Sequence, residues 1–409
     1  MDAGHSMAQT NWDNVYLVIS QANEVISKYE HSTDEKIQSY LKEARFWRVY
    51  AYDKLYHLYG TVPLVTGKED ISNGIARATK EEMESFIETE YKAVESLPDT
   101  YPNTDYGRPT SWAAKASAAR YYLNKKDWTK ASELALDVIQ NGNFKLVDYQ
   151  DIFSSNQNNE TILAINHIAK AGRGNKYVAL ALEASLREAL GIEGVSASNG
   201  YGMSTPFFRT FDPADKRIEK YDPVTGKGIL VSGIIYQADG TPLYGTVEQP
   251  KTVEEQLERV ITFKWEVQQN IPLGEDAGLN MPILRLGETL LTYAEAQNEL
   301  GNTQTAAEYV NMIRERAGLS PLPSSVSGDQ TAMRTAILDE RGWELYHEGY
   351  RREDLVRNGK LLEKINEKYR FYFGTDMPWA NDQGRIYQKI PTSALLLNPL
   401  LKQNEYSVN

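Results

Sequence analysis

The chain has 409 residues, with 24% charged and 41% hydrophobic side chains, the balance of a globular protein large enough for one extended core or two to three domains. Its formal net charge of −12 repels phosphate backbones, so we expect no nucleic-acid partner. The absence of cysteine excludes disulfides, thiolate zinc sites and cysteine nucleophiles. Tyrosine is unusually frequent, with 26 residues against 10 phenylalanines, and its apolar ring with a polar tip suits half-exposed binding surfaces.

Neither a membrane helix nor a signal peptide is expected in this sequence. No stretch approaches the roughly 18–20 apolar residues that a membrane-spanning helix needs. Residues 1–16 lack the apolar core of a signal peptide. The sequence itself therefore offers no segment that would insert into a bilayer.

Helical periodicity dominates the first third of the chain. The second helical pattern ends at Gly60, because the segment up to Pro63 cannot continue a helix. Thr79 and Glu82 form a capping box that opens the third helix. The helices predicted in this part are 12–29, 33–59, 79–97, 111–124 and 127–140.

The pattern changes over about 141–281. Helical periodicity weakens apart from 178–190, and Gly, Asn, Ser and Pro become frequent. Short β-like runs occur at 228–236 and 260–265. A loop-rich region of this length is usually functional.

Helical hairpins return in the last third. Helices are predicted at 284–300 and 303–317, joined by a Gly-Asn turn, and a long one at 329–348. The region 366–409 again reads as irregular. Two short helices with small residues at their crossing resemble tetratricopeptide units, although the pairs do not align as strict repeats.

Motifs for catalysis and metal binding are missing. None of the five histidines is spaced as a metal ligand, and the sequence contains no H-E-x-x-H, G-x-S-x-G or Walker motif. We therefore expect no metal, no cofactor and no enzymatic activity.

Three acidic residues on the last long helix could in principle supply a catalytic pair of carboxyl groups. Glu340, Glu344 and Glu348 share one helix face, and glycoside hydrolysis needs two facing carboxyl groups. We favour a helix face that is either solvated or paired with arginine, with help from nearby Arg341, Arg351 and Arg352. Asp215 and Arg217 are expected to lock a loop in the same way.

Four segments in order carry a pattern shared with one family. They are LKEARFWRVYAYDKLYHLYGTVPLVTG (41–67), PILRLGETLLTYAEAQNELGNTQTAAEYVNMIRERAGL (282–319), ILDERGWELYHEGYRREDLVRNGK (337–360) and IYQKIPTSALLLNPLL (386–401). Together they resemble the SusD/RagB family of glycan-binding outer-membrane lipoproteins of Bacteroidetes. Each segment alone is weak, whereas the ordered set is specific.

The resemblance implies a mainly α-helical fold, a SusD-like superhelix of tetratricopeptide-like hairpins with minor β-structure. It implies a single domain over 1–409, with the helical scaffold at about 9–140 and 282–360, a loop-rich capture region at about 141–281 and an irregular segment at 361–409. Charged residues of the matched motifs are expected to pair between helices. They are Arg45, Glu288, Glu295, Glu340, Arg341 and Glu348.

The function implied by the resemblance is nutrient capture. Such a protein binds an oligo- or polysaccharide at the outward-facing side of the outer membrane and delivers it to a SusC-like TonB-dependent transporter, without catalysis. Its membrane attachment would be a lipid anchor on a cysteine that this sequence does not contain. Within the family, a peptide or another polymer is an alternative nutrient.

The resemblance transfers no ligand contacts, so the site is predicted from composition. Sugar rings stack their flat C–H faces on Trp and Tyr, and their hydroxyl groups need Asn, Asp and Arg, with each stack contributing about 1 kcal/mol by analogy with aromatic pairs. Aromatic and polar residues of the irregular regions meet this need. The predicted glycan-binding residues are Trp265, Tyr201, Asn199, Tyr236, Trp379 and Arg173.

Two other functions remain open from the sequence. A tetratricopeptide-like interaction scaffold would have an exposed concave groove, but it would not need the loop-rich region. A glycoside hydrolase would place two carboxyl groups about 5–10 Å apart across a cleft.

Overall fold

The computed structural model forms two compact units. The first comprises Met1–Val138, Gly359–Leu362 and Pro378–Asn409, and the second comprises Ile139–Asn358 and Glu363–Met377. The structure describes residues 4–67, 69–70, 72–182, 187, 192, 195–198, 201–219, 222, 228, 230–231, 235–236, 242–244, 259–268 and 276–405.

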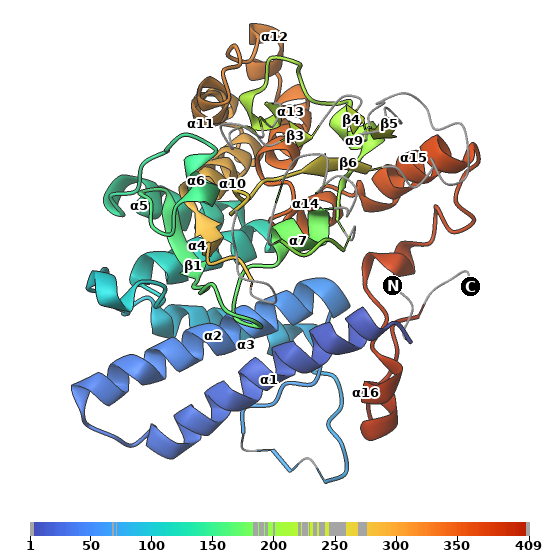
Figure 1. The fold of residues 1–409 in the computed structure, drawn as a ribbon. Helices are drawn as coiled ribbons and strands as arrows, with labels where there is room; N and C mark the ends of the chain where they lie inside the picture. Colours follow the sequence, from blue (N-terminus) through green and yellow to red (C-terminus); the bar gives the residue numbers. More distant parts are fainter. Residues whose placement is uncertain are drawn as a thin grey trace. The chain divides into compact units, whose positions relative to one another are not determined.

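The first unit is helical, and its two longest helices form a hairpin (Figure 1). The side chain of Asp34 caps the second of them by accepting hydrogen bonds from the backbone N–H groups of Lys36 and Ile37. That helix ends at Gly60, which has φ +72. The elements are α1 (Ser6–Tyr29), α2 (Glu35–Tyr59), α3 (Lys80–Val94), η1 (Asn103–Asp105), α4 (Ser111–Lys125), α5 (Trp128–Asn141), η4 (Gln383–Ile386) and α16 (Thr392–Leu397).

Buried charges fasten α2 to α3 in this unit. Arg48 donates to Glu90 at 2.7 Å and to Asn23 at 2.8 Å. Arg45 also pairs with Glu90, at 3.0 Å, which confirms the expected pairing of this motif arginine. The capping box of Thr79 and Glu82 is present.

The second unit combines helices with three small antiparallel sheets. Their strand orders are β1-β7, β2-β6-β3 and β4-β5. The strands are β1 (Thr161–Ile165), β2 (Met203–Ser204), β3 (Leu230–Val231), β4 (Ile235–Tyr236), β5 (Pro242–Tyr244), β6 (Arg259–Thr262) and β7 (Met281–Arg285). The helices are α6 (Asp151–Ser154), α7 (Tyr177–Ala181), α9 (Thr205–Phe208), η2 (Lys216–Ile218), α10 (Leu286–Glu299), α11 (Thr303–Arg316), α12 (Ser324–Ser327), α13 (Gln330–Glu344), α14 (Arg351–Arg357) and α15 (Leu361–Phe373).

Helices α10, α11 and α13 pack around one apolar core, and they lie together in Figure 1. Leu290, Val310, Ile313 and Ile337 are fully or almost fully buried there. The predicted helical hairpin is therefore confirmed. Leu300, which the periodicity also placed on this face, is instead 42% exposed, because α10 ends one residue before it.

A central charge cluster links β1, β7, α11 and α13 below that core. Glu344 is the shared acceptor, contacting Arg285 at 2.5 Å, Arg217 at 3.2 Å and also Arg316. The other side chains of the cluster lie beside these. The central charge cluster consists of Glu160, Asp215, Arg217, Lys264, Arg285, Arg314, Arg316, Glu340, Glu344 and Glu348.

The cluster shows which residues pair with the glutamates on α13 and just after its C-terminal end. Glu340, Glu344 and Glu348 are each paired with at least one arginine, as expected. Two of the expected partners were wrong, because Arg341 pairs with Asp354 and Arg351 donates to the Leu338 carbonyl. The actual partners are distant in the sequence and reach α13 only through the fold. Asp215 does lock the Arg217 loop, at 2.7 Å.

Arg341 belongs to a second buried group of charges. It contacts Asp354 at 2.9 Å, Glu288 at 3.5 Å and Glu295 at 3.7 Å. Arg357 contacts both Glu295 and Asp354 as well. These charges tie α10, α13 and α14 together, as the motif residues predicted.

Replacing Gly287 by alanine is expected to destabilise the second unit by about 1–3 kcal/mol, because the new methyl group would overpack the cluster. A Cβ atom there would lie 2.5 Å from Arg285 Nη1, 2.9 Å from Glu160 Oε1 and 3.0 Å from Glu344 Oε1. Alanine ordinarily stabilises a helix relative to glycine. A higher free energy of unfolding for the variant, measured by urea unfolding, would therefore contradict this packing.

The end of the chain differs from the prediction. The region 366–409 was expected to be irregular, yet it contains residues 366–373 of α15 and all of α16. Helix α16 has no side-chain cap hydrogen bond, so its start carries no local sequence signal of that kind.

Candidate functional site

Two of the predicted glycan-binding residues meet in the second unit at Tyr177, the first residue of α7. The Tyr201 ring stacks on the Tyr177 ring with centroids 6.4 Å apart and an angle of 16°. The Trp265 ring also contacts Tyr177, with ring centroids 4.3 Å apart and an angle of 45°. We call Tyr201, Tyr177 and Trp265 the aromatic row. Backbone hydrogen bonds from Ser198 and Tyr201 to α7 hold its outer end in place.

The two ends of the aromatic row differ in exposure. Tyr201 is 43% exposed, so part of its surface is open to solvent. Trp265 is only 2% exposed and packs against Phe153 at 5.1 Å in the core of this unit. Its Nε1 has no hydrogen-bond partner among the described residues. A ring that is to stack on a sugar needs an open face, and Tyr201 has more open surface than Trp265.

Arg173 lies apart from the row, on an exposed turn that follows β1. Its backbone N–H donates to the Lys170 carbonyl, and its carbonyl accepts from Ile168. The turn is fastened by Asp276, which accepts from the N–H of Gly172 at 2.8 Å. The Arg173 side chain is thus presented on a well-anchored loop.

The remaining predicted residues are placed in other parts of the chain. Trp379 belongs to the first unit, where it is half-buried and Arg385 lies 4.5 Å above its ring. Tyr236 belongs to β4, and its side chain lies outside the described residues. Asn199 also lies outside the described residues.

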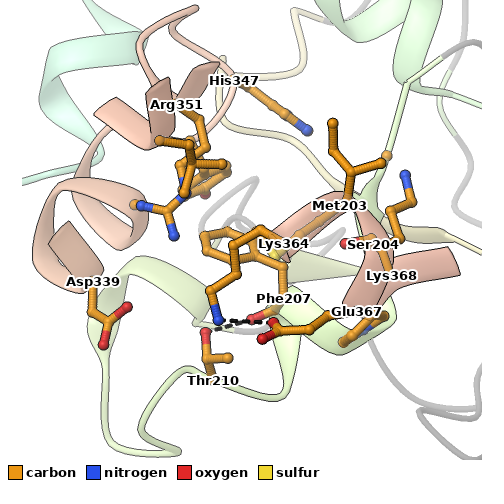
Figure 2. Close-up of a pocket in the computed structure, with 16 residues that line it drawn as sticks. Met203, Ser204, Phe207, Thr210, Asp339, His347, Arg351, Lys364, Glu367 and Lys368 are labelled. Atoms are coloured by element: carbon orange, nitrogen blue, oxygen red, sulfur yellow. Dashed lines mark hydrogen bonds and ion pairs between the residues drawn. The ribbon is translucent and has the colours of Figure 1, made fainter. Parts of the chain in front are cut away.

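A pocket of about 380 Å³ opens beside the residues that follow Tyr201, entirely within the second unit (Figure 2). Its walls come from β2 and α9, from α13 and the residues after it, and from α14 and α15. Phe207 and the buried Tyr346 supply aromatic surface. This volume falls in the range of small-molecule sites.

Charged side chains from three helices surround the pocket. Figure 2 shows Asp339, Arg351, Lys364 and Glu367 arranged about Phe207. Lys364 is neutralised by Glu367 at 2.8 Å on the rim. Burial raises the pKa of Asp339, while Arg351 and Lys364 act in the opposite direction. Asp339 and Arg351 were not predicted as site residues because the 337–360 motif was interpreted as scaffold alone, and no motif pointed to Lys364 or Glu367.

His347 forms the inner wall where the pocket meets the aromatic row. It has a left-handed backbone, with φ +60, and its Nδ1 contacts the Tyr177 hydroxyl. Burial and, to a lesser extent, the positive charge of Lys264 lower the pKa of His347 to about 4. The imidazole is therefore neutral in the folded protein at pH 7.

The stability of the protein is expected to fall by about 3 kcal/mol between pH 7 and pH 4 through His347 alone. The unfolded chain takes up a proton near pH 6.5, whereas the folded state resists it down to about pH 4, so acid favours unfolding. The measurement is urea unfolding at both pH values. His347→Asn, which tolerates the left-handed backbone, should show a smaller acid loss. Equal losses in both proteins would contradict the assignment.

Neither metal chemistry nor a membrane span is visible in the described part of the chain. No group of three or more His, Asp or Glu residues there could hold a metal ion. Among the same residues, no helix is both long and apolar enough to cross a bilayer.

Comparison with known proteins assigns the chain to a protein family. The SusD family model matches residues 147–406, and a model for starch-binding proteins associating with the outer membrane matches residues 2–123. The chain is 24% identical to SusD-like protein P25 of Formosa agariphila, over 97% of this chain and 79% of that protein. It is 26% identical to the starch-binding protein SusD of Bacteroides thetaiotaomicron, over 98% and 79% respectively.

The fold agrees with this match. A solved laminarin-binding SusD-like protein superposes with a TM-score of 0.74 at 22% identity, covering 97% of this chain and 85% of that one. The predicted mainly helical, SusD-like fold is thereby confirmed. The chain belongs to the SusD family, whose members bind their ligands without catalysis.

Proposed function

We propose that this protein binds an oligo- or polysaccharide at the cell surface and delivers it to a SusC-like TonB-dependent transporter. Membership of the SusD family carries the proposal, because the two family matches together cover most of the chain. The matched relatives include one named as starch-binding and one named as laminarin-binding. The described surface adds the exposed Tyr201 beside a pocket lined by polar and aromatic groups.

The location follows from the same match. The N-terminal family model describes proteins that associate with the outer membrane. We propose attachment through a lipid anchor, which the resemblance to the SusD/RagB lipoproteins implies. A surface position facing outward would let the protein meet polymers too large to enter the cell.

The proposed glycan contacts are the six residues that the composition predicted. Tyr201 would stack on a sugar ring, and Arg173 would donate to hydroxyl groups from its exposed turn. Trp379 with Arg385 offers a second, half-buried aromatic group in the first unit. Asn199 and Tyr236 remain proposed glycan-binding residues. Trp265 would contribute from within the aromatic row, by supporting Tyr177 beneath Tyr201.

Weak contacts of this kind suit capture followed by release. One aromatic stack contributes about 0.5–1.5 kcal/mol, so several are needed before a polymer is retained. A chain held at several weak points can be passed on without breaking one strong interaction. The arrangement therefore favours handover over storage.

Retardation in native gels that contain polysaccharides tests the binding. A panel of plant, host and microbial polysaccharides would be used, followed by calorimetry with the polymer that retards the protein. Tyr201→Ala is expected to weaken binding roughly five- to tenfold, the loss of one stack. Tyr40→Ala is a matched control, since Tyr40 is also 43% exposed but lies on α2. Equal binding by both variants would remove Tyr201 from the site.

Co-purification tests the delivery step. The protein, tagged and expressed in its own host at native level, is expected to bring down a TonB-dependent transporter identified by mass spectrometry. A preparation that binds polysaccharide yet never contains such a transporter would contradict delivery and leave capture intact.

A further inference from the structure

The pocket beside the aromatic row contains polar groups that have no hydrogen-bond partner among the residues that the structure describes. The Asp339 carboxylate, on α13, accepts none from that part of the chain. Arg351 donates once, from Nη1 to the Leu338 carbonyl at 2.6 Å, which leaves its Nε and Nη2 groups available. Both side chains are half-buried and line the pocket, so their remaining donors and acceptors are open to a polar ligand.

The Arg351 guanidinium is held in a fixed position on that wall. A Cβ atom at Gly342 would lie 2.8 Å from Arg351 Nη1 and 2.9 Å from its Cζ, so the guanidinium lies directly against this glycine. On another side, its Cζ is 5.6 Å from the centre of the Phe207 ring. The donors of Arg351 are thus oriented before a ligand arrives, which reduces the entropy that binding must offset.

The charge pattern selects the chemical class of ligand. An anion would meet the Asp339 carboxylate and a cation would meet Arg351, whereas Lys364 is already neutralised by Glu367. Lys368 also lines the pocket and has an interaction of its own with another group. An uncharged ring with several hydroxyl groups can donate to Asp339 and accept from Arg351 at once. Phe207 and Tyr346 provide apolar surface for its C–H faces.

We propose that this pocket binds one uncharged sugar ring of the captured glycan, with Asp339 accepting from its hydroxyl groups and Arg351 donating to them. The proposal rests on the proposed function, since it assumes that the ligand is a glycan. It adds a small subsite, lined by residues that directly follow Tyr201 in the sequence, to the surface contact at Tyr201.

Calorimetry with small sugars tests the pocket separately from the polymer site. The probes are the methyl glycosides of glucose, galactose, mannose and xylose, with glucuronic acid as the charged comparison. The wild-type protein should bind at least one neutral glycoside, and Asp339→Asn should weaken that binding roughly tenfold or more, because a hydrogen bond to a charged group is lost. Glu363→Gln, a change at an exposed carboxylate of α15 outside the pocket, should leave it unchanged.

A second variant checks the geometry without touching a binding group. Gly342→Ala should displace the Arg351 guanidinium and weaken the same glycoside at least severalfold, while circular dichroism confirms that the variant is folded. The bound glycoside should also reduce retardation by the polysaccharide.

The outcomes separate the two proposals. Polysaccharide retardation with no glycoside binding, or with glycoside binding that Asp339→Asn leaves unchanged, would overturn the pocket assignment while capture stands. Tighter binding of glucuronic acid than of every neutral glycoside would overturn the uncharged class. Failure of both polymers and glycosides to bind the wild-type protein would overturn capture and pocket together.

Discussion

Replacing Glu344 by alanine is expected to lower the free energy of unfolding by about 3–5 kcal/mol, the cost of removing one carboxylate from a buried network of charges. Glu344 is fully buried and is shared by Arg217, Arg285 and Arg316. Although burial raises it, the nearby guanidinium groups hold the pKa of Glu344 well below its usual range. Removal of this carboxylate would leave a cavity and one excess positive charge among three buried arginines, whose other acceptors are Asp215, Glu340, Glu160 and Glu348.

Urea unfolding monitored by circular dichroism measures this loss. Glu367→Gln is the matched control, because Glu367 pairs with Lys364 on the surface and a pair of that kind contributes only about 0–1 kcal/mol. A loss below about 1 kcal/mol in Glu344→Ala would show that water or rearrangement replaces the carboxylate, and it would contradict the central role given to this residue.

Replacing Trp265 by alanine is expected to destabilise the protein by about 3–5 kcal/mol, as for other fully buried large aromatic residues. The indole packs between Tyr177 and Phe153, so its removal would open a cavity beneath Tyr201. Thermal unfolding measures the loss. Any weakening of glycan binding in this variant would then follow from disorder of the aromatic row.

Trp265→Phe separates packing from contact with the ligand. It keeps most of the apolar volume, and only larger losses of volume strongly perturb a core. The affinity of this variant for polysaccharide should therefore lie within about twofold of that of the wild-type protein. A Trp265→Phe variant that is stable yet fails to bind would show that the indole itself touches the glycan.

Local signals predicted the helical scaffold well. The capping box at Thr79 and the stop at Gly60 lie where the structure has them, because caps depend on a few adjacent residues. The pairing of Glu340, Glu344 and Glu348 was also predictable, since charges on a buried helix face need partners. Their partners were not, because Arg217 and Arg285 reach α13 through contacts that span many residues.

The candidate site was harder to predict, for a physical reason. Composition shows that a loop carries aromatic residues, but it does not show which ring is covered. Trp265 and Tyr201 looked alike in the sequence, yet one fills the core and the other is exposed. Likewise, Asp339 and Arg351 lay inside a scaffold motif, and only the folding of α9 and α15 around them forms a pocket.

Retardation by polysaccharides in native gels, comparing the wild-type protein with Tyr201→Ala, tests the central claim most directly. The account predicts that at least one class of polysaccharide slows the wild-type protein and slows the variant clearly less. Identical mobility of the wild-type protein in every polysaccharide gel and in a gel without polysaccharide would contradict glycan capture.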